Sequence, residues 1–193
     1  MRFIFSVLLF IAAVWYLRTG PVEPTEGVSA PKPPIQTPTQ KNSWTQGDVT
    51  IKPLYRYELT ARVLKKRRYY FDEGAKFCPI DLALGWQDMS NPAFYKKLNI
   101  NQYNRWYHYT YPRDFSDPSR IVRMSANTHI VPASEVIKKE IFSLRENETV
   151  ELKGYLIEVT DAKGGRWVSS TTREDTAGGS CELMWVEGAR KIY

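Results

Sequence analysis

The sequence predicts a β-rich α+β fold, preceded by an N-terminal apolar segment and a proline-rich linker. After residue 49, apolar and polar residues alternate with a period of two over several segments, a pattern typical of half-buried strands. Only two segments place their apolar residues at helical spacing. Apolar residues make up 42% of the 193-residue chain, which is enough to form a core and indicates a folded protein.

Residues 1–18 are predicted to anchor the chain in a membrane. Their apolar residues run from Phe3 to Leu17 and would span about 22 Å as a helix, against about 30 Å for a bilayer core. This length suits a signal anchor or a cleaved secretory signal. The small residues at 28–30 lie far downstream and precede Pro31, so we favour an uncleaved anchor. We expect a single-pass protein of the bacterial inner membrane with its domain in the periplasm.

Residues 19–48 form the predicted linker. They contain six of the twelve prolines of the chain and few aliphatic side chains, so they cannot bury a core. Such a composition is typical of an extended, partly polyproline spacer. The exported β-rich domain is therefore expected to cover residues 49–193.

Within this domain the alternation predicts several strands and the helical spacing predicts two helices. Ser134 is a candidate N-cap for a helix that places Ile137 and Ile141 on one face, and Pro92 suits the first turn of a second helix. The paired glycines at 164–165 indicate a hairpin. We expect a small curved sheet or barrel with one or two helices, with strands at residues 55–63, 105–111, 149–159, 166–172 and 181–186.

Several motifs between about residues 55 and 187 carry a resemblance to a family. They are FCPIDLALGW, NRWYHY, SANTHIVPA, LKGYLIEV and RWVSSTTREDTAGGSCELMWV. Together they resemble a family of uncharacterised bacterial membrane-anchored proteins, and the resemblance implies an architecture but no activity. The order of a long strand with a basic end, a helix and the LKGYLIEV strand is also similar to OB-fold barrels, although three predicted strands follow the helix where that fold has two.

Cofactor and metal sites have no clear signature in the sequence. The chain has two histidines without H-x-x-x-H spacing, no C-x-x-C pair, no calcium loop and no glycine-rich phosphate loop. We therefore expect neither a metal centre nor a cofactor. The two cysteines, Cys78 and Cys181, could form one disulfide in an oxidising compartment.

Cys181 is the one candidate nucleophile, with His129 as its base. A catalytic thiol needs a histidine nearby and a partly open setting, and His129 lies in a polar segment that could form an exposed loop. However, Cys181 begins an alternating apolar run with Leu183 and Trp185, which favours a buried or disulfide-bonded thiol. We therefore favour a non-enzymatic protein and keep a cysteine-dependent hydrolase or transferase as the alternative.

The strongest basic segment consists of Lys65, Lys66, Arg67 and Arg68, followed by three aromatic residues. On an OB-like surface this composition would suit single-stranded nucleic acid, because basic residues contact phosphates and aromatic rings stack on bases. The net charge of +6 also favours anionic partners. An exported domain rarely meets nucleic acid, so we favour a solvated turn between strands.

Two polar segments are predicted to form a ligand-binding or partner-binding patch. SANTHIVPA supplies Asn127 and His129, and SSTTRED supplies Arg173 and Asp175. We expect both segments to meet at one rim of the sheet. The sequence thus predicts a membrane-tethered binding or assembly protein, with the membrane and an envelope protein as partners and nucleic acid as a less favoured one.

Overall fold

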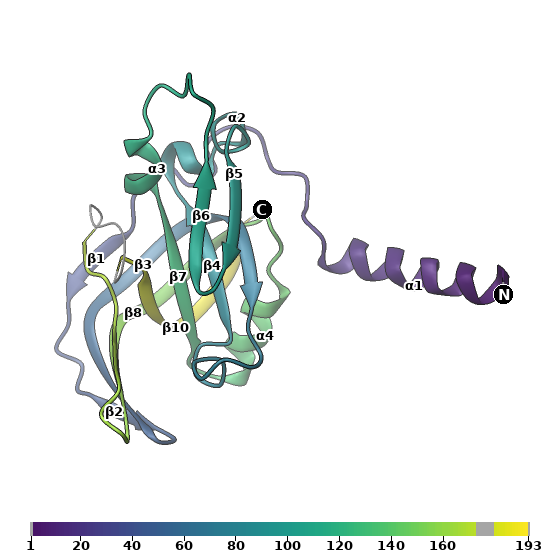
Figure 1. The fold of residues 1–193 in the computed structure, drawn as a ribbon. Helices are drawn as coiled ribbons and strands as arrows, with labels where there is room; N and C mark the ends of the chain where they lie inside the picture. The colour runs from purple at the N-terminus through teal and green to yellow at the C-terminus, as the bar shows by residue number, and fades with distance from the viewer. Residues whose placement is uncertain (1, 173–179, 193) are drawn as a thin grey trace.

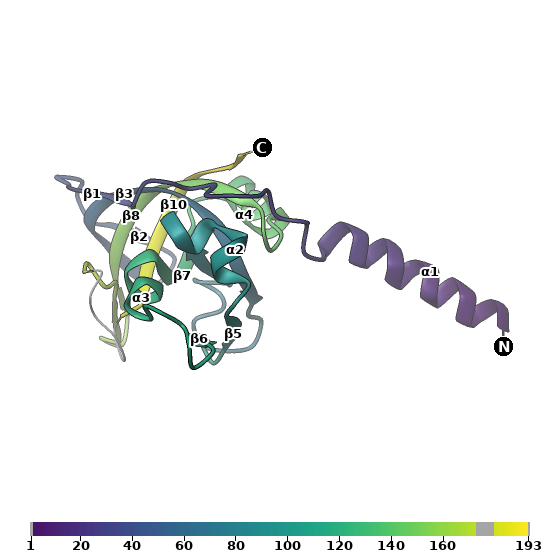
Figure 2. The same cartoon turned by 90° about the horizontal axis from the view of Figure 1, so that it is seen from above.

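The computed structural model describes residues 2–172 and 180–192. They form an α+β domain built on a curved, mixed sheet, with the helix α1 (Arg2–Thr19) projecting away from it (Figures 1 and 2). The predicted class, β-rich α+β with a curved sheet, is confirmed. The strands are β1 (Ile35–Pro38), β2 (Trp44–Gln46), β3 (Val49–Arg68), β4 (Ile80–Gly85), β5 (Asn99–Tyr103), β6 (Trp106–Thr110), β7 (Ser125–Pro132), β8 (Thr149–Asp161), β9 (Arg166–Val168) and β10 (Glu182–Ile192). The helices within the domain are η1 (Gln87–Ser90), α2 (Pro92–Tyr95), α3 (Ser119–Met124) and α4 (Glu135–Ser143).

The 20-residue strand β3 organises the main sheet. It pairs antiparallel with β4, and β4 pairs antiparallel with β7. Strand β10 lies parallel to β7 and antiparallel to β8, and β8 pairs in turn with β3. The path of paired strands therefore returns to β3. The short strands β1 and β2 add to β3, and β9 adds to β8.

The two faces of these strands carry different side chains because successive residues point to opposite sides. One face encloses the largest apolar cluster, to which β3, β4, β7, β8 and β10 all contribute, and Ile141 of α4 packs into it. On β4 and β7 the residues in between include Asp81, Asn127 and His129. These three side chains are also buried, but on the outer face of the sheet. The hairpin of β5 and β6 lies in front of this face in Figure 1.

Residues 20–48 lie along the domain rather than forming the expected free spacer. β1 and β2 occupy the edge of β3, where unpaired backbone groups would otherwise remain. The backbone of Val22 donates to the carbonyl of Glu146, and that of Gln87 donates to the buried Ala30. The proline-rich composition prevents these residues from building a core of their own, but not from adding to an existing one.

Hydrogen bonds from Arg62 also hold residues 20–48 against the domain. Its guanidinium is fully buried in the domain and donates to the carbonyl oxygens of Ser90, Asn147 and Thr25 at 2.6, 2.7 and 2.9 Å. A buried charge needs such partners, because burying it without them is costly. Thr25 belongs to residues 20–48, so this segment supplies one of the hydrogen-bond acceptors of the buried Arg62 guanidinium.

The N-terminal helix α1 carries its apolar side chains on the outside. Residues such as Phe10 and Leu17 are exposed along its length. Of the helices in residues 2–172 and 180–192, none reaches the combination of length and apolar composition that crossing a membrane requires.

Most predicted elements of the domain are present. Helix α4 begins after the predicted cap Ser134, and α2 begins at Pro92 as predicted. The side chains of Ser134 and of Asn91, which was not predicted as a cap, accept hydrogen bonds from the first turns. Gly164 adopts a positive φ of 85° in the turn between β8 and β9. Strands β4, β5 and β7 were not predicted, because continuous apolar runs and polar strands lack a clear alternation.

Candidate functional site

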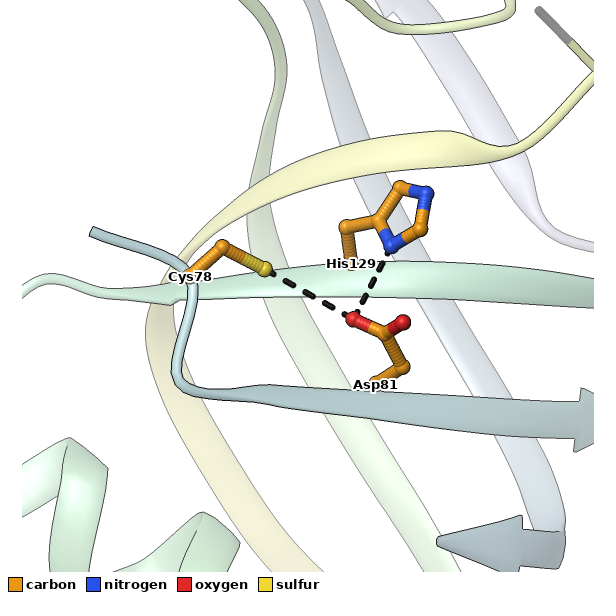
Figure 3. A group of neighbouring side chains, drawn as sticks. All are labelled: Cys78, Asp81 and His129. Atoms are coloured by element: carbon orange, nitrogen blue, oxygen red, sulfur yellow. Dashed lines mark hydrogen bonds and ion pairs between the residues drawn. The ribbon is translucent and has the colours of Figure 1, made fainter. Parts of the chain in front are cut away.

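A buried polar cluster on the outer face of β4 and β7 is the candidate functional site. Asp81 of β4 and His129 of β7 are direct neighbours in the strand register, and Nδ1 of His129 lies 2.9 Å from Oδ1 of Asp81. The sulfur of Cys78, just before β4, lies 3.7 Å from the same carboxylate oxygen. Figure 3 shows the three side chains converging from the two strands. The Asp81 side chain is 0% exposed.

Arg105 covers this cluster on the side of the hairpin formed by β5 and β6. It lies in the turn between β5 and β6, where Asn104 and Arg105 both have positive φ angles, 50° and 67°. Its Nη1 donates to Oδ1 of Asp81 at 3.0 Å and to the carbonyl of Cys78 at 2.8 Å, and Nη2 donates to Asp72 at 2.6 Å. The guanidinium also stacks on the ring of Tyr69, 3.7 Å from its centroid. One side chain thereby fastens the hairpin tip to β4 and to residues 69–79.

The electrostatics of the cluster favour a charged Arg105 and a protonated Cys78. Burial opposes the charge on Arg105, but the bond to Asp72 and the charges around it leave its pKa raised. Burial, together with the Asp81 carboxylate, raises the pKa of the Cys78 thiol well above its usual value. The same two causes raise the pKa of Tyr69 to about 12. Without a further cation, Cys78 is therefore a thiol and not a thiolate at neutral pH.

Asn127 links the cluster to the start of β10. Its Nδ2 donates to the carbonyl of Arg105 at 3.0 Å and lies 3.7 Å from the sulfur of Cys181, while its Oδ1 accepts from Gln102 at 2.6 Å. Residues of β5, of the turn between β5 and β6, of β7 and of the approach to β10 are thus joined by contacts of the Asn127 side chain. The amide of Asn127 fixes the position of the hairpin as the ion pair of Arg105 does.

Two buried polar atoms in the cluster lack a hydrogen bond among the described residues. One is Oδ2 of Asp81, and the other is Nδ1 of His129, which is close to Asp81 but not aligned with it as a hydrogen bond. The bonded charges are two carboxylates, Asp72 and Asp81, and one guanidinium, Arg105. Since buried polar atoms are nearly always paired, the two unpaired atoms distinguish the cluster from an ordinary buried ion pair.

The structure corrects the expected setting of His129 and the expected disulfide. SANTHIVPA is not an exposed loop, because Ser125–Pro132 forms β7 and its His129 is buried. Cys181 contacts Asn127, and Leu183, two residues further along the chain, is the register partner of His129. No disulfide joins Cys78 and Cys181. Cys78 is instead the cysteine that lies against the pair of Asp81 and His129.

The other half of the predicted ligand patch lies outside the described residues. This applies to Arg173 and Asp175, and to Glu174 between them. The beginning of the same segment is described, and it lies against the start of β10: the backbone of Ser170 donates to Cys181, and the hydroxyl of Ser169 accepts from Leu183. The predicted meeting of the two segments at one rim remains a prediction.

The basic segment at the end of β3 mostly serves helix α4. The ammonium of Lys66 donates to the carbonyl of Leu144, and Arg68 donates to the carbonyl of Phe142. Both carbonyls are at the C-terminal end of α4, where cations stabilise a helix. Lys65 pairs with Glu146 at 2.8 Å, and of the four residues Arg67 alone is exposed. The basic residues therefore do not form the predicted solvated turn. Most of them contact the C-terminal end of α4 or the residues after it, and so connect β3 to α4.

Sequence reasoning missed Asp81 and Arg105 as site residues and named Cys78 only as a disulfide candidate. Asp81 was the available signal, because one acidic residue inside the apolar segment IDLALG has to be compensated when that segment is buried. Its partners could not be read from spacing, since they come from separate strands and from a hairpin turn. Comparisons of the chain with protein-family models, with curated proteins and with solved structures found no match.

Proposed function

We propose that this protein is a membrane-tethered, exported binding protein whose domain is an OB-like barrel. The order of strand pairing supports the barrel. Five strands, β3, β4, β7, β8 and β10, close on themselves with β7 and β10 parallel. Helix α4 lies between the third and fourth of them, as in OB folds. The sequence predicts three strands after the helix, where an OB fold has two. The additional one is β9, a three-residue strand within the connection from β8 to β10.

The observation that carries the binding role is the presentation of two aromatic side chains next to the buried cluster. In residues 69–79, which connect β3 to β4, Tyr70 is 66% exposed and Phe71 is 100% exposed. The same connection is fastened by Arg105 through Tyr69, Asp72 and Cys78. Exposed aromatic rings on a fixed backbone are typical binding anchors, since little conformational entropy is lost when they are covered.

This connection is also where OB-like barrels engage their ligands. In that fold the binding surface consists of the second and third strands with the loops after the first and fourth strands. Here these correspond to β4, β7, residues 69–79 and residues 162–181. The hairpin of β5 and β6 covers much of the β4 and β7 surface, so the loop after β3 is the part left to meet a partner. We propose an envelope protein as that partner.

The tether in this proposal is α1. Its exposed apolar side chains suit hydrocarbon better than water. Its apolar residues from Phe3 to Leu17 would span about 22 Å, the length of a short anchor against a bilayer core of about 30 Å. Arg2 precedes the apolar residues and Arg18 follows them. We propose a single-pass anchor in the inner membrane of a bacterium, with the domain in the periplasm.

Site-specific photo-crosslinking in cells tests this function. We expect a photoreactive residue at Phe71 of the full chain to give a discrete protein adduct in the membrane fraction. The matched control is Ile35 on β1, which is also well exposed but lies on another part of the domain. Equal adduct yields at both positions, or adducts that disappear on nuclease treatment, would contradict a protein partner at this loop. Release of the adduct into the soluble fraction would contradict the anchor.

A thiol enzyme that uses Cys181 and His129 is the second candidate function. One observation favours it: Asp81 lies against Nδ1 of His129, as the orienting carboxylate of a catalytic base would. Against it, the thiol of Cys181 lies next to Asn127, and the thiol against Asp81 is that of Cys78.

Alkylation kinetics separate the two candidates. We expect iodoacetamide to modify Cys181 in the folded chain no faster than a free peptide thiol, because no activated thiolate is needed for binding. Cys78, which is fully buried with a raised pKa, should react only after denaturation. Peptide mapping of the alkylated sites gives both rates. Accelerated modification of Cys181 that is lost in His129→Ala would favour the thiol enzyme.

A further inference from the structure

We propose that Cys78, Asp81 and His129 form a binding site for one Zn²⁺ ion or a similar divalent transition-metal ion. All three side chains are buried, and one ligand atom from each lies within 4.8 Å of the other two. Thiolate, imidazole and carboxylate are the three side-chain ligands that zinc uses in proteins. The inference concerns the interior of the cluster and does not depend on the proposed binding function.

Two of the three distances between ligand atoms are close to those around a tetrahedral ion. With metal–ligand distances typical of zinc, a nitrogen and an oxygen ligand are about 3.4 Å apart, and a sulfur and an oxygen ligand about 3.6 Å. The corresponding distances here are 2.9 Å from Nδ1 of His129 to Oδ1 of Asp81, and 3.7 Å from Sγ of Cys78 to the same oxygen. The third pair, the Cys78 and His129 ligand atoms, lies within 4.8 Å, against about 3.5 Å around a tetrahedral ion, so binding would draw the thiol and the imidazole closer together.

The unsatisfied atoms of the cluster also point to an ion. Nδ1 of His129 lies close to Asp81 without hydrogen-bond alignment, and Oδ2 of Asp81 has no partner among the residues the structure describes. A proton shared between His129 and Asp81 would account for only one of these atoms. An ion that accepts the lone pair of Nδ1 accounts for the imidazole, and it accounts for Oδ2 as well when both oxygens of the Asp81 carboxylate bind it.

The charges balance when an ion is bound. Asp72, Asp81 and Arg105 sum to one negative charge. Binding of a divalent cation would release the thiol proton of Cys78 to solvent, so the thiolate adds one negative charge and the ion adds two positive charges. The sum over these groups is then zero, with Asp81 fully buried and the Asp72 side chain 41% exposed at the edge of the cluster. Arg105 need not leave, since a carboxylate oxygen has a second lone pair beyond the one that accepts from the guanidinium.

Three protein ligands leave a fourth position, which Oδ2 of Asp81 or a water molecule can fill. The ring of Trp167 packs against the imidazole, with its centroid 4.8 Å away, and Arg105 covers the carboxylate. Such surroundings fix the ligands and limit the access of solvent. The ion would join β4 to β7 directly beneath the connection formed by residues 69–79.

Cobalt substitution of the full chain in detergent tests the site. The chain has only two cysteines, so in the Cys181→Ser variant any cobalt–thiolate bond must involve Cys78. After treatment with a chelator, we expect wild type and Cys181→Ser each to bind one Co²⁺. Both should then show a near-ultraviolet thiolate-to-cobalt charge-transfer band that Zn²⁺ removes. Absence of the band in the folded wild-type chain, or its loss in Cys181→Ser, would overturn the proposal.

Histidine variants provide a second readout. His129 and His108 are the only histidines of the chain. We expect His129→Ala to raise the dissociation constant for Co²⁺ by at least about tenfold, and His108→Ala, which removes a ring stacked on Tyr103, to leave it unchanged. Equal effects of the two substitutions would exclude His129 as a ligand and overturn the site as assigned.

Discussion

Replacement of Arg105 by alanine is expected to destabilise the domain by about 3–5 kcal/mol. The guanidinium is the positive partner of Asp81, whose side chain is 0% exposed, and it also holds Asp72 and the carbonyl of Cys78. Its removal leaves a buried carboxylate without its counter-charge. Urea unfolding at neutral pH, followed by tryptophan fluorescence, measures the change in the free energy of unfolding.

Two further variants show whether the loss arises at Asp81. Arg166 pairs with Glu158 on the surface, and its side chain is 61% exposed, so Arg166→Ala should leave the free energy of unfolding nearly unchanged. Adding Asp81→Asn to Arg105→Ala removes the stranded charge and should recover part of the lost stability. If Arg105→Ala unfolds at the same urea concentration as Arg166→Ala, the cluster does not hold the hairpin.

Gly154→Ala is expected to have an effect of similar or larger size, about 4 kcal/mol or more. Gly154 lies in β8 opposite Val186 of β10 and opposite Tyr57 of β3. A Cβ atom at this position would overlap the backbone carbonyl of Trp185, and a carbonyl within a sheet cannot rotate away as a side chain can. We expect either a large fall in the melting temperature or loss of folded protein.

Gly188→Ala is the matched control for this substitution. Gly188 lies on the other side of the register shift in the same pair of strands, opposite Lys153. A Cβ atom there would meet its nearest neighbour at 3.8 Å, an ordinary van der Waals contact. The alanine variant should therefore melt within a few degrees of wild type. Similar melting temperatures for the two variants would contradict the close approach of β8 and β10.

The sequence predicted the elements whose signals are local. The Ser134 cap and Pro92 at the first helical position predicted the starts of α4 and α2, and the alternation over residues 149–159 predicted β8. β4 and β7 escaped prediction because both of their faces are buried, one in the apolar core and the other in the polar cluster. A strand with two buried faces has no exposed polar side to produce alternation.

The site was harder to predict because its chemistry depends on contacts between distant residues. Asp81 meets His129 through the pairing of β4 with β7, and it meets Arg105 through a turn that lies over the sheet. Neither contact follows from sequence spacing. The prediction that His129 belongs to a functional patch rested on polar residue types, which indicated an exposed loop. These polar residues are instead buried in β7. Their burial places His129 against the carboxylate of Asp81, which the thiol of Cys78 also contacts.

Attachment of residues 20–48 to the domain determines how far it can travel from α1. A free spacer of this length would have a root-mean-square reach of roughly 30 Å. Because Val22 is already bonded to Glu146, only Gly20 and Pro21 separate the helix from the first fixed point, and so short a joint extends no more than about 10 Å. If α1 is embedded, the domain cannot sweep through the surrounding compartment. It would rock in a thin layer above the lipid, and a partner would have to come to that layer to be captured.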